Sequence, residues 1–566
     1  MIMKKVLNIL ICLMSIASYG QEHIWESTDF AQTNNSWSKK YRLELTQSDE
    51  KLVVGYYRDS LNIASEALYS SKNYGVFLAK YSSEDELLWA KTIAERMSVS
   101  SSTPSVEVDN LGNIYAGFIY IDTLFVQGEA FPVLEDCYNC SDFMVLKFDP
   151  AGNQLHHLRL DDNCTNYIDS EGIKFDEDQN MYISVSAHNP QYGSEPIPTC
   201  ECGNGVDTLV VEVFNPFIAK FNQNGEGLWI KDIFGDVAMI EIIGEFIYVV
   251  GSSSQSSISF GDFTLNLPEF YNQAGYIAKF DTSGVFHWAK HFGVQAWDSH
   301  LQILDVKAID ENNITLVGRS FTQSVPNQVF FQNSSTLNGD PWASDDFFIV
   351  NYDSLGNVKW HDITVSSGYE KPMQIASDPE RNIYVTGNFS NTLYFADDTL
   401  NTFGSDDVMV VAYSITGEEL WAKQVGGTGS DQGKGIGIDS NQNIYVLGGT
   451  SSNALEFGNL SYELSGSAAQ MFLAKLKLSG IGVYEFEAIN SIELYPNPNT
   501  GAFSIRSEQN LEQLEIYNLL GEKVFEKYFS KPTKQQEIET SLITGVYFVL
   551  IKTVDGNYTA QKMIVE

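Results

Sequence analysis

One five-residue phrase recurs seven times along the chain, and this repetition constrains the fold more than any other feature. Its copies combine aliphatic and aromatic residues and lie at 77–81, 144–148, 217–221, 276–280, 348–352, 409–413 and 472–476. In the inner copies a turn glycine follows, and a tryptophan stands four residues after it, as in Gly225 with Trp229 or Gly417 with Trp421. A period of roughly sixty residues is typical of a repeat architecture whose units pack against their neighbours.

Each repeat is predicted to contain four short antiparallel strands. In the most regular copy these strands are 420–425, 435–439, 443–448 and 471–476, and Gly, Asn, Asp or Ser residues bound them. No helical periodicity competes with this pattern. Four strands in each of seven repeats predict an all-β fold, a seven-bladed β-propeller, over residues 21–478.

The phase of the repeats predicts which strand lies at the axis and how the ring closes. Neighbouring blades crowd at the axis, so the strand with small residues, such as Gly435 and Gly437, is expected to be innermost, and the tryptophan strand outermost. The repeats end one outer strand short, and we expect the N-terminal strand 22–27 to supply it. Trp25, rather than Trp37, then takes the tryptophan position of the last blade, because its spacing to the next repeat strand is closer to that of the other copies.

The alternating strand directions sort the connections onto two faces. Tight turns fall on one face and variable loops on the other, which is where a rigid scaffold usually carries its binding residues. Five cysteines lie in these variable loops: Cys137, Cys140, Cys164, Cys200 and Cys202. In an exported protein such cysteines favour disulfides over a zinc cluster, so at least one disulfide is expected among them.

The N-terminus predicts export, and the net charge restricts the partners. Lys4 and Lys5 precede an apolar run, and small residues follow it, so residues 1–20 are predicted to be a signal peptide. No later segment is apolar for long enough to form a transmembrane helix. The chain has 73 acidic and 34 basic residues and a formal net charge of -39. Nucleic acid and anionic membranes are therefore not expected as partners, because both need basic patches.

After residue 478 the repeat pattern stops. Residues 479–490 are predicted to be a linker, and alternating short strands in 491–566 predict a small antiparallel β-sandwich. This region contains a characteristic set of residues: Tyr495, Pro496, Asn497, Pro498, Gly501, Gly521, Gly545, Tyr547 and Lys562. Through these residues it closely resembles the type A sorting domain of the type IX secretion system of Bacteroidetes. The resemblance implies recognition by the type IX secretion machinery, and release or attachment at the cell surface.

The repeats are similar to the bacterial β-propeller repeat family known as SBBP, and the best agreement runs from Gly435 to Gly448. That family has no common activity. The resemblance therefore implies a fold and not a function.

No residue pattern in the chain predicts a catalytic centre or a cofactor. The Gly-x-Ser-x-Gly elbow, phosphate loops, dinucleotide fingerprints and metalloprotease histidine pairs are all missing from the sequence. The acidic turns that begin at Asp109, Asp176 and Asp439 resemble parts of a calcium loop. Tight hairpin turns select the same residue types, so we interpret them as turns, with Ca²⁺ binding as the alternative.

The favoured function is a secreted or cell-surface propeller that binds a glycan or protein through its variable loop face. The alternative is a secreted polysaccharide hydrolase or lyase whose acids converge at the propeller axis, because the separation of two catalytic carboxylates is spatial and not visible in sequence. A third interpretation is a structural adhesin without a discrete ligand.

Overall fold

A computed structural model describes most of the chain. The described residues are 23–33, 40–96, 103–133, 141–160, 167–188, 200–202, 209–211, 216–233, 235–267, 273–294, 300–321, 328–331, 336–338, 345–366, 368–458, 460–464, 470–478, 493–507, 510–518, 523–529, 531, 533–554 and 558–565. The predicted signal peptide 1–20, the predicted linker 479–490, Trp37, Gly521, Cys137, Cys140 and Cys164 lie outside them. All regular elements of this described set are strands, which confirms the all-β prediction.

The described chain forms two compact units, His23–Leu478 and a C-terminal unit with strands between 493 and 565. Among these residues there is no helix of the length and apolar character that crossing a membrane requires.

The unit His23–Leu478 is built from four-stranded antiparallel meanders. The first contains β2 (Tyr41–Leu45), β3 (Lys51–Ile63), β4 (Glu66–Tyr81) and β5 (Leu87–Arg96). The second contains β6 (Ser105–Val108), β7 (Ile114–Tyr120), β10 (Asp142–Phe148) and β11 (Gln154–Leu160). The third contains β12 (Tyr167–Phe175), β13 (Met181–His188), β16 (Phe217–Phe221) and β17 (Gly227–Asp232). The fourth contains β18 (Asp236–Ile243), β19 (Phe246–Ser253), β22 (Ala274–Asp281) and β23 (Phe286–Val294).

Three more meanders follow the same plan. The fifth contains β24 (His300–Asp310), β25 (Asn313–Phe321), β28 (Asp346–Tyr352) and β29 (Val358–Ile363), and the short β30 (Val365–Ser366) comes after it. The sixth contains β31 (Glu370–Ser377), β32 (Ile383–Phe389), β35 (Asp407–Tyr413) and β36 (Glu419–Gly426). The seventh contains β37 (Asp431–Ile438), β38 (Ile444–Thr450), β41 (Gln470–Leu478) and, from the other end of the unit, β1 (His23–Thr33).

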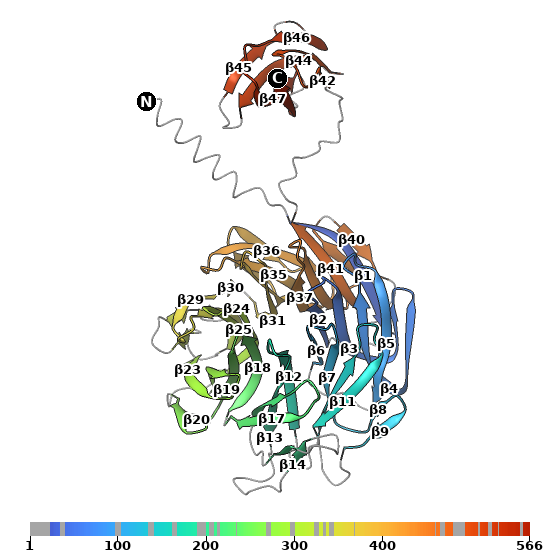
Figure 1. Cartoon of the computed structure of the whole chain (residues 1–566), viewed down its shortest axis with the longest axis vertical. Coiled ribbons are helices and arrows are strands. Elements are labelled where there is room, and N and C mark those ends of the chain that lie inside the picture. The colour runs from blue at the N-terminus through green and yellow to red at the C-terminus, as the bar shows by residue number, and fades with distance from the viewer. Residues whose placement is uncertain are drawn as a thin grey trace. The chain divides into compact units, whose positions relative to one another are not determined.

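The first strand of each meander lies nearest the centre of this unit. Figure 1 shows β2, β6, β12, β18, β24, β31 and β37 around the middle of the unit, with the other strands outside them. Residues from these same strands line one central cavity. The predicted order, with the strand before the tight turn innermost and the tryptophan strand outermost, is confirmed.

Several tryptophans of the repeat pack against the turn of the next meander. The indole Nε1–H of Trp229 donates to the carbonyl of Thr282 at 3.3 Å, and that of Trp288 donates to Ser354 at 3.1 Å. Trp360 donates in the same way to Ile415 at 2.9 Å. A Cβ added at Gly417, whose φ is +87°, would lie 2.5 Å from the Trp360 ring. The recurring glycine therefore supplies a left-handed turn and makes room for the indole.

The N-terminal strand pairs with the last repeat strand, as predicted. β1 runs antiparallel to β41 from His23↔Leu478 to Gln32↔Gln470, and its end pairs with β3 as well. The register differs from the prediction in one respect. Trp25 lies opposite Leu476, the last residue of the five-residue phrase in β41. Trp229 and Trp288 instead lie opposite the fourth residue of that phrase in their own meanders. In β1 this position belongs to Ser27, which lies opposite Lys475. No hairpin turn connects β41 to β1, so the four-residue glycine-to-tryptophan spacing does not constrain this strand.

Insertions between the second and third strands fold into hairpins. These insertion hairpins are β8 (Leu124–Val126) with β9 (Glu129–Phe131), β14 (Cys200–Cys202) with β15 (Leu209–Val211), β20 (Ser257–Phe260) with β21 (Phe263–Asn266), β26 (Gln328–Phe331) with β27 (Thr336–Asn338), β33 (Thr392–Phe395) with β34 (Asp398–Asn401), and β39 (Ala454–Phe457) with β40 (Leu460–Glu463). Four of them pair with the outer strand of the preceding meander, through β8–β5, β14–β11, β26–β23 and β39–β36. They cover outer edges that would otherwise be open to further strand pairing.

The C-terminal unit consists of two antiparallel sheets with a shared core. One sheet has β42 (Glu493–Tyr495), β43 (Ala502–Arg506) and β46 (Gln535–Glu539), and the other has β44 (Leu511–Asn518), β45 (Lys523–Tyr528), β47 (Gly545–Thr553) and β48 (Tyr558–Val565). Phe503 and Ile538 from the first sheet pack with Ile516 and Val549 from the second. This arrangement agrees with the predicted β-sandwich.

Candidate functional site

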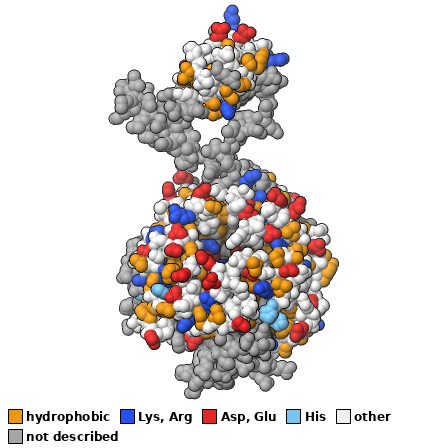
Figure 2. All heavy atoms as spheres, in the orientation of Figure 1, with side chains coloured by type: hydrophobic (Ala, Val, Ile, Leu, Met, Phe, Trp, Pro, Cys, Tyr) orange, Lys and Arg blue, Asp and Glu red, His pale blue; other side chains and the backbone are white. Residues whose placement is uncertain are grey.

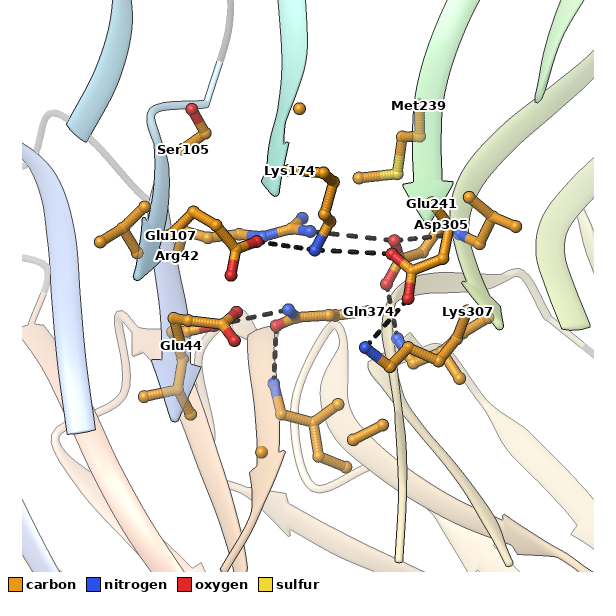
Figure 3. Close-up of a pocket in the computed structure, with 18 of the residues that line it drawn as sticks. Arg42, Glu44, Ser105, Glu107, Lys174, Met239, Glu241, Asp305, Lys307 and Gln374 are labelled. Atoms are coloured by element: carbon orange, nitrogen blue, oxygen red, sulfur yellow. Dashed lines mark hydrogen bonds and ion pairs between the residues drawn. The ribbon is translucent and has the colours of Figure 1, made fainter. Parts of the chain in front are cut away.

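The strongest candidate site is a polar cluster at the centre of the unit His23–Leu478. The strand register places one residue from each inner strand in a common layer around the centre. In every meander this residue pairs with the corresponding residue of the second strand. Glu44 pairs with Leu52, Glu107 with Tyr115, Lys174 with Tyr182, Glu241 with Tyr248, Lys307 with Thr315, Ala376 with Tyr384 and Gly437 with Tyr445. Two residues earlier, Arg42, Asp305 and Gln374 belong to a second layer. We call Arg42, Glu44, Glu107, Lys174, Glu241, Asp305, Lys307 and Gln374 the axial cluster, and Figure 3 shows them pointing into one cavity.

Alternating charges connect four consecutive meanders. Lys174 Nζ lies 2.8 Å from Glu107 Oε2 and 3.5 Å from Glu241 Oε2, and Lys307 Nζ lies 3.1 Å from Glu241 Oε1 (Figure 3). Burial opposes the charge of Lys174, but the neighbouring carboxylates outweigh it and hold its pKa above the usual value. Burial likewise raises the pKa of Glu241, but Lys307 and Lys174 outweigh it and hold that pKa below its usual range. The charges of Lys174 and Glu241 are therefore stabilised by their neighbours in the layer.

The second layer connects both neighbouring meanders and meanders that are distant in sequence. Arg42 Nη2 from the first meander approaches Asp305 Oδ1 of the fifth at 3.8 Å, and Asp305 Oδ2 accepts the backbone N–H of Ile375 at 2.8 Å. Gln374 of the sixth meander accepts the N–H of Ile436 from the seventh at 2.9 Å and donates to the carbonyl of Leu43 at 3.4 Å. These polar contacts bind the inner strands to one another at the centre.

Burial raises the pKa of two carboxyl groups of the axial cluster, those of Glu44 and Asp305. Burial, with further repulsion from Glu107, raises the pKa of Glu44 to about 7, and Lys174, Lys307 and Arg42 only partly oppose this shift. A carboxyl with such a pKa exchanges a proton close to neutral pH, which is the property required of a general acid or base.

The cavity around the axial cluster has a volume of about 160 Å³. This volume has room for a few water molecules or a small polar group, because a water occupies about 30 Å³ of liquid. The cluster lies close to the tight turns, since Glu107 and Lys174 each stand two residues before the turn aspartate of their strand. Figure 2 shows charged side chains of both signs interspersed over the visible face of the larger unit.

Sequence reasoning missed the axial cluster. The inner strand was identified from the small residues Gly435 and Gly437 and from the segment around Ala376, but these are exceptions among the repeats. The equivalent positions in the other inner strands carry charged side chains. These side chains extend into the central cavity, which Ala376 and Gly437 line with small residues. Glu107 and Lys174 each stand two residues before a tight-turn aspartate, but the first and fourth repeats have no aspartate at that position of the turn, and Lys307 stands three residues before Asp310. The alternation of Glu and Lys is therefore not visible from this spacing alone.

The acidic turns and paired aspartates act as hydrogen-bond acceptors within the backbone framework. Asp439 accepts the N–H groups of Asn441 and Asn443 and the hydroxyl of Tyr445. This arrangement matches the predicted turn role of the Asp-rich segments. Asp407 accepts the N–H of Phe403 at 2.8 Å and the amide of Gln424 at 2.6 Å, so it caps a loop.

The residues of the predicted sorting signal lie around the last strand of the C-terminal unit. Asn497 donates to the carbonyl of Lys562 at 2.6 Å and accepts the N–H of Ile564 at 2.8 Å. Tyr495, Pro496 and Pro498 flank this contact, and Gly501 follows with a φ of +93°. Gly545 begins β47, and the buried Tyr547 donates its hydroxyl to the carbonyl of Ile543 at 2.9 Å. The exposed residues of this group are Tyr495, Pro496, Asn497, Pro498 and Lys562, and their recognition by the secretion machinery remains a prediction.

The disulfide prediction also stays a prediction. The backbone of Cys200 and Cys202 forms β14, and Cys202 pairs with Leu160 of β11. The side chains of these two residues, like Cys137, Cys140 and Cys164, lie outside the described set.

Known proteins resemble both units. Residues 493–566 match the family model described as "Secretion system C-terminal sorting domain", and residues 420–456 match the model described as "Beta-propeller repeat". An uncharacterized WD repeat-containing protein, L264, of Acanthamoeba polyphaga mimivirus is 21% identical over 506 residues, which cover 74% of this chain and 36% of that protein. The chain thus spans about a third of the length of this relative.

Solved structures with related shapes are distant. A protein of unknown function from Dyadobacter fermentans is 9% identical with a TM-score of 0.35, covering 81% of this chain and 99% of its own. BamB from Moraxella catarrhalis is 10% identical with a TM-score of 0.30, covering 73% and 92%, and a DUF4221 member from Bacteroides vulgatus is 9% identical with a TM-score of 0.30, covering 81% and 98%. Similarity at this level carries no argument about function.

The two family matches agree with the resemblances read from the residues, and sorting domains of this kind direct proteins out of the cell. The chain is therefore a secreted or cell-surface protein that carries SBBP-type β-propeller repeats and a C-terminal type IX secretion sorting domain.

Proposed function

We propose that this protein is a seven-bladed β-propeller, closed by β1, that binds a glycan or protein through its variable loop face after export. The meanders described above are its blades. Support for the closed ring comes from the pairing of β1 with both β41 and β3, and from the common cavity lined by the inner strands.

The observation that carries the binding role is the pairing of charges at the axis. Lys174 and Lys307 hold the carboxylates of Glu107 and Glu241, and the Asp305 carboxylate accepts a backbone amide. These groups therefore stabilise the ring and are poorly placed to act on a substrate. Recognition then falls to the loops, which vary most between repeats.

The experiment is a glycan array and a panel of surface proteins probed with the full secreted chain. A variant that lacks 189–199, the segment between β13 and β14, is expected to lose binding. The tight-turn variant Asn441→Ala is the matched control and is expected to retain it. Equal loss of binding in the two variants, or no ligand in either panel, contradicts the proposal.

The pKa of Glu44 supports a second candidate function, in which the protein is a polysaccharide hydrolase or lyase with its active site at the axis. The Glu44 carboxyl has a pKa of about 7 and stands beside Glu107 at the cavity, which resembles the unequal acid pair of glycoside hydrolases. A screen of polysaccharides for turnover tests this role. Turnover that Glu44→Gln abolishes, while folding is retained, establishes the enzyme and refutes a purely binding function.

A further inference from the structure

The second meander lacks the tryptophan that locks the other outer strands to their neighbours. His156 of β11 lies opposite Lys147, the register position that Trp229 and Trp288 occupy opposite Lys220 and Lys279. Gly225 is the glycine of the turn in the next meander. A Cβ added to it would lie 3.7 Å from Nε2 of the His156 imidazole. The histidine thus stands in the place of the indole, with a smaller ring.

A cavity of about 220 Å³ occupies the space next to this histidine. Its walls are mainly apolar and aromatic, and they include Tyr115, Val145, Phe175 and Met181. Leu155 lies at its edge and is 55% exposed, so the cavity is reached from solvent beside that residue. An engineered apolar cavity of about 150 Å³ binds benzene, so this one has room for a bicyclic ring.

The cavity also contains an acceptor for a ring N–H. In three other meanders the tryptophan Nε1–H donates to the carbonyl two residues before the turn glycine, as in Trp229 to Thr282. The equivalent carbonyl here belongs to Gln223, which lines the cavity. Within the described part of the chain, no donor is found on this carbonyl oxygen.

Lys147 does not replace the missing donor. Its counterparts Lys220 and Lys279 donate to the corresponding carbonyls at 3.0 and 3.2 Å. Lys147 instead lies 4.0 Å from Asp109 and 5.0 Å from the centre of the Tyr115 ring. In the third and fourth meanders a tryptophan and a lysine both donate to the equivalent carbonyl. Here the tryptophan is missing and the lysine, Lys147, is directed away.

We propose that this cavity, the indole pocket, binds the indole group of a ligand, supplied by free indole or by a tryptophan side chain of a peptide. The ring lies beside His156 in the cavity, against Phe175 and Met181, and its N–H donates to the Gln223 carbonyl. Burial, followed by the neighbouring His157 and Lys147, lowers the pKa of His156. A neutral imidazole at physiological pH suits contact with an uncharged aromatic ring.

The test uses ¹⁹F NMR of 5-fluoroindole and of N-acetyl-5-fluorotryptophan amide with the full chain. Saturable line broadening of at least one probe, reversed by the unlabelled compound, is expected. Binding of both probes means that either source is accepted, and binding of one alone identifies the source. The compound 1-methylindole, which lacks the N–H, is expected to compete about tenfold more weakly, which corresponds to the loss of one hydrogen bond of about 1.4 kcal/mol.

Two variants separate the indole pocket from non-specific binding. His156→Trp is expected to fill the pocket with an internal indole, abolish probe binding and raise the melting temperature. Trp288→His, at an equivalent interface, is expected to create a second pocket and a second binding event. The proposal is overturned if neither probe binds the native chain at millimolar concentration, or if His156→Trp folds and binds as well as the native protein. Equal competition by 1-methylindole overturns the role given to Gln223.

Discussion

Replacing Trp25 by alanine tests how the two ends of the repeat region are joined. Trp25 is 5% exposed and lies on β1, opposite Leu476 of β41. Its ring meets Phe457 of an insertion hairpin edge-on, with 5.5 Å between ring centres. It belongs to the same core as Phe472 and Leu476, so its removal opens a cavity between β1 and the last repeat strand.

The magnitude follows from burial and size. Truncation of a buried tryptophan costs about 3–5 kcal/mol, and the edge-on contact with Phe457 favours the upper half of that range. A unit of the length of His23–Leu478 has an entropy of unfolding of about 1 kcal/mol/K. The melting temperature is therefore expected to fall by about 4–5 °C.

Thermal melts and hydrogen exchange form the assay, with Trp360→Ala as the matched control. Trp360 belongs to the fifth meander and packs against a different core, so removing its ring leaves the β1–β41 ladder intact. Both variants are expected to melt earlier, but only Trp25→Ala should increase amide exchange along β1 and β41. Trp37→Ala is expected to cost less than Trp25→Ala.

The reasoning is refuted by either of two results. A melting temperature that Trp25→Ala leaves unchanged means that the ring is not part of the core. A larger loss in Trp37→Ala means that Trp37, not Trp25, anchors the closing strand.

Four further outcomes are expected. Lys174→Met removes the cation between two axial carboxylates and should lower the free energy of unfolding by about 2–3 kcal/mol, which is less than the cost of breaking a fully buried ion pair. Lys174→Arg keeps the cation and should retain most of the native stability. Equal melting temperatures of the two variants would contradict this expectation. The pKa of Glu44 rises from 4.5 to about 7 on folding, so the folded state takes up a proton between these values and stability falls as pH rises through this window. Glu44→Gln should therefore match the native protein below about pH 4.5 and exceed its stability above pH 7, by up to about 3 kcal/mol, and a pH-independent difference in melts would exclude this. Deletion of 491–566 should trap the protein in the periplasm, and normal amounts of the truncated form outside the cell would count against the sorting role. Peptide mapping without reduction should find at least one disulfide among the five cysteines of the variable loops, and five free thiols would disprove it.

The all-β character, the inner and outer strands and the sorting unit were predictable because they rest on local patterns. Short strands bounded by Gly and Asn, a glycine four residues before a tryptophan, and the segment from Tyr495 to Pro498 are each visible within a few residues. Each pattern reflects a local requirement, such as the left-handed turn at Gly417 that makes room for Trp360. Even the pairing of β1 with β41 follows from counting strands.

Other features depend on residues that are distant in sequence and meet only in the folded chain. The charges of Glu107, Lys174 and Glu241 come from three repeats, and each residue alone is an ordinary strand residue. Only their convergence at the axis makes them partners, because buried charges must be neutralised by neighbours. The cavity beside His156 likewise exists only because the next repeat presents the Gly225 turn to a ring too small to fill the space. The register of Trp25 was also decided by tertiary pairing, since no turn links β41 to β1 and the ladder itself sets which residues face each other.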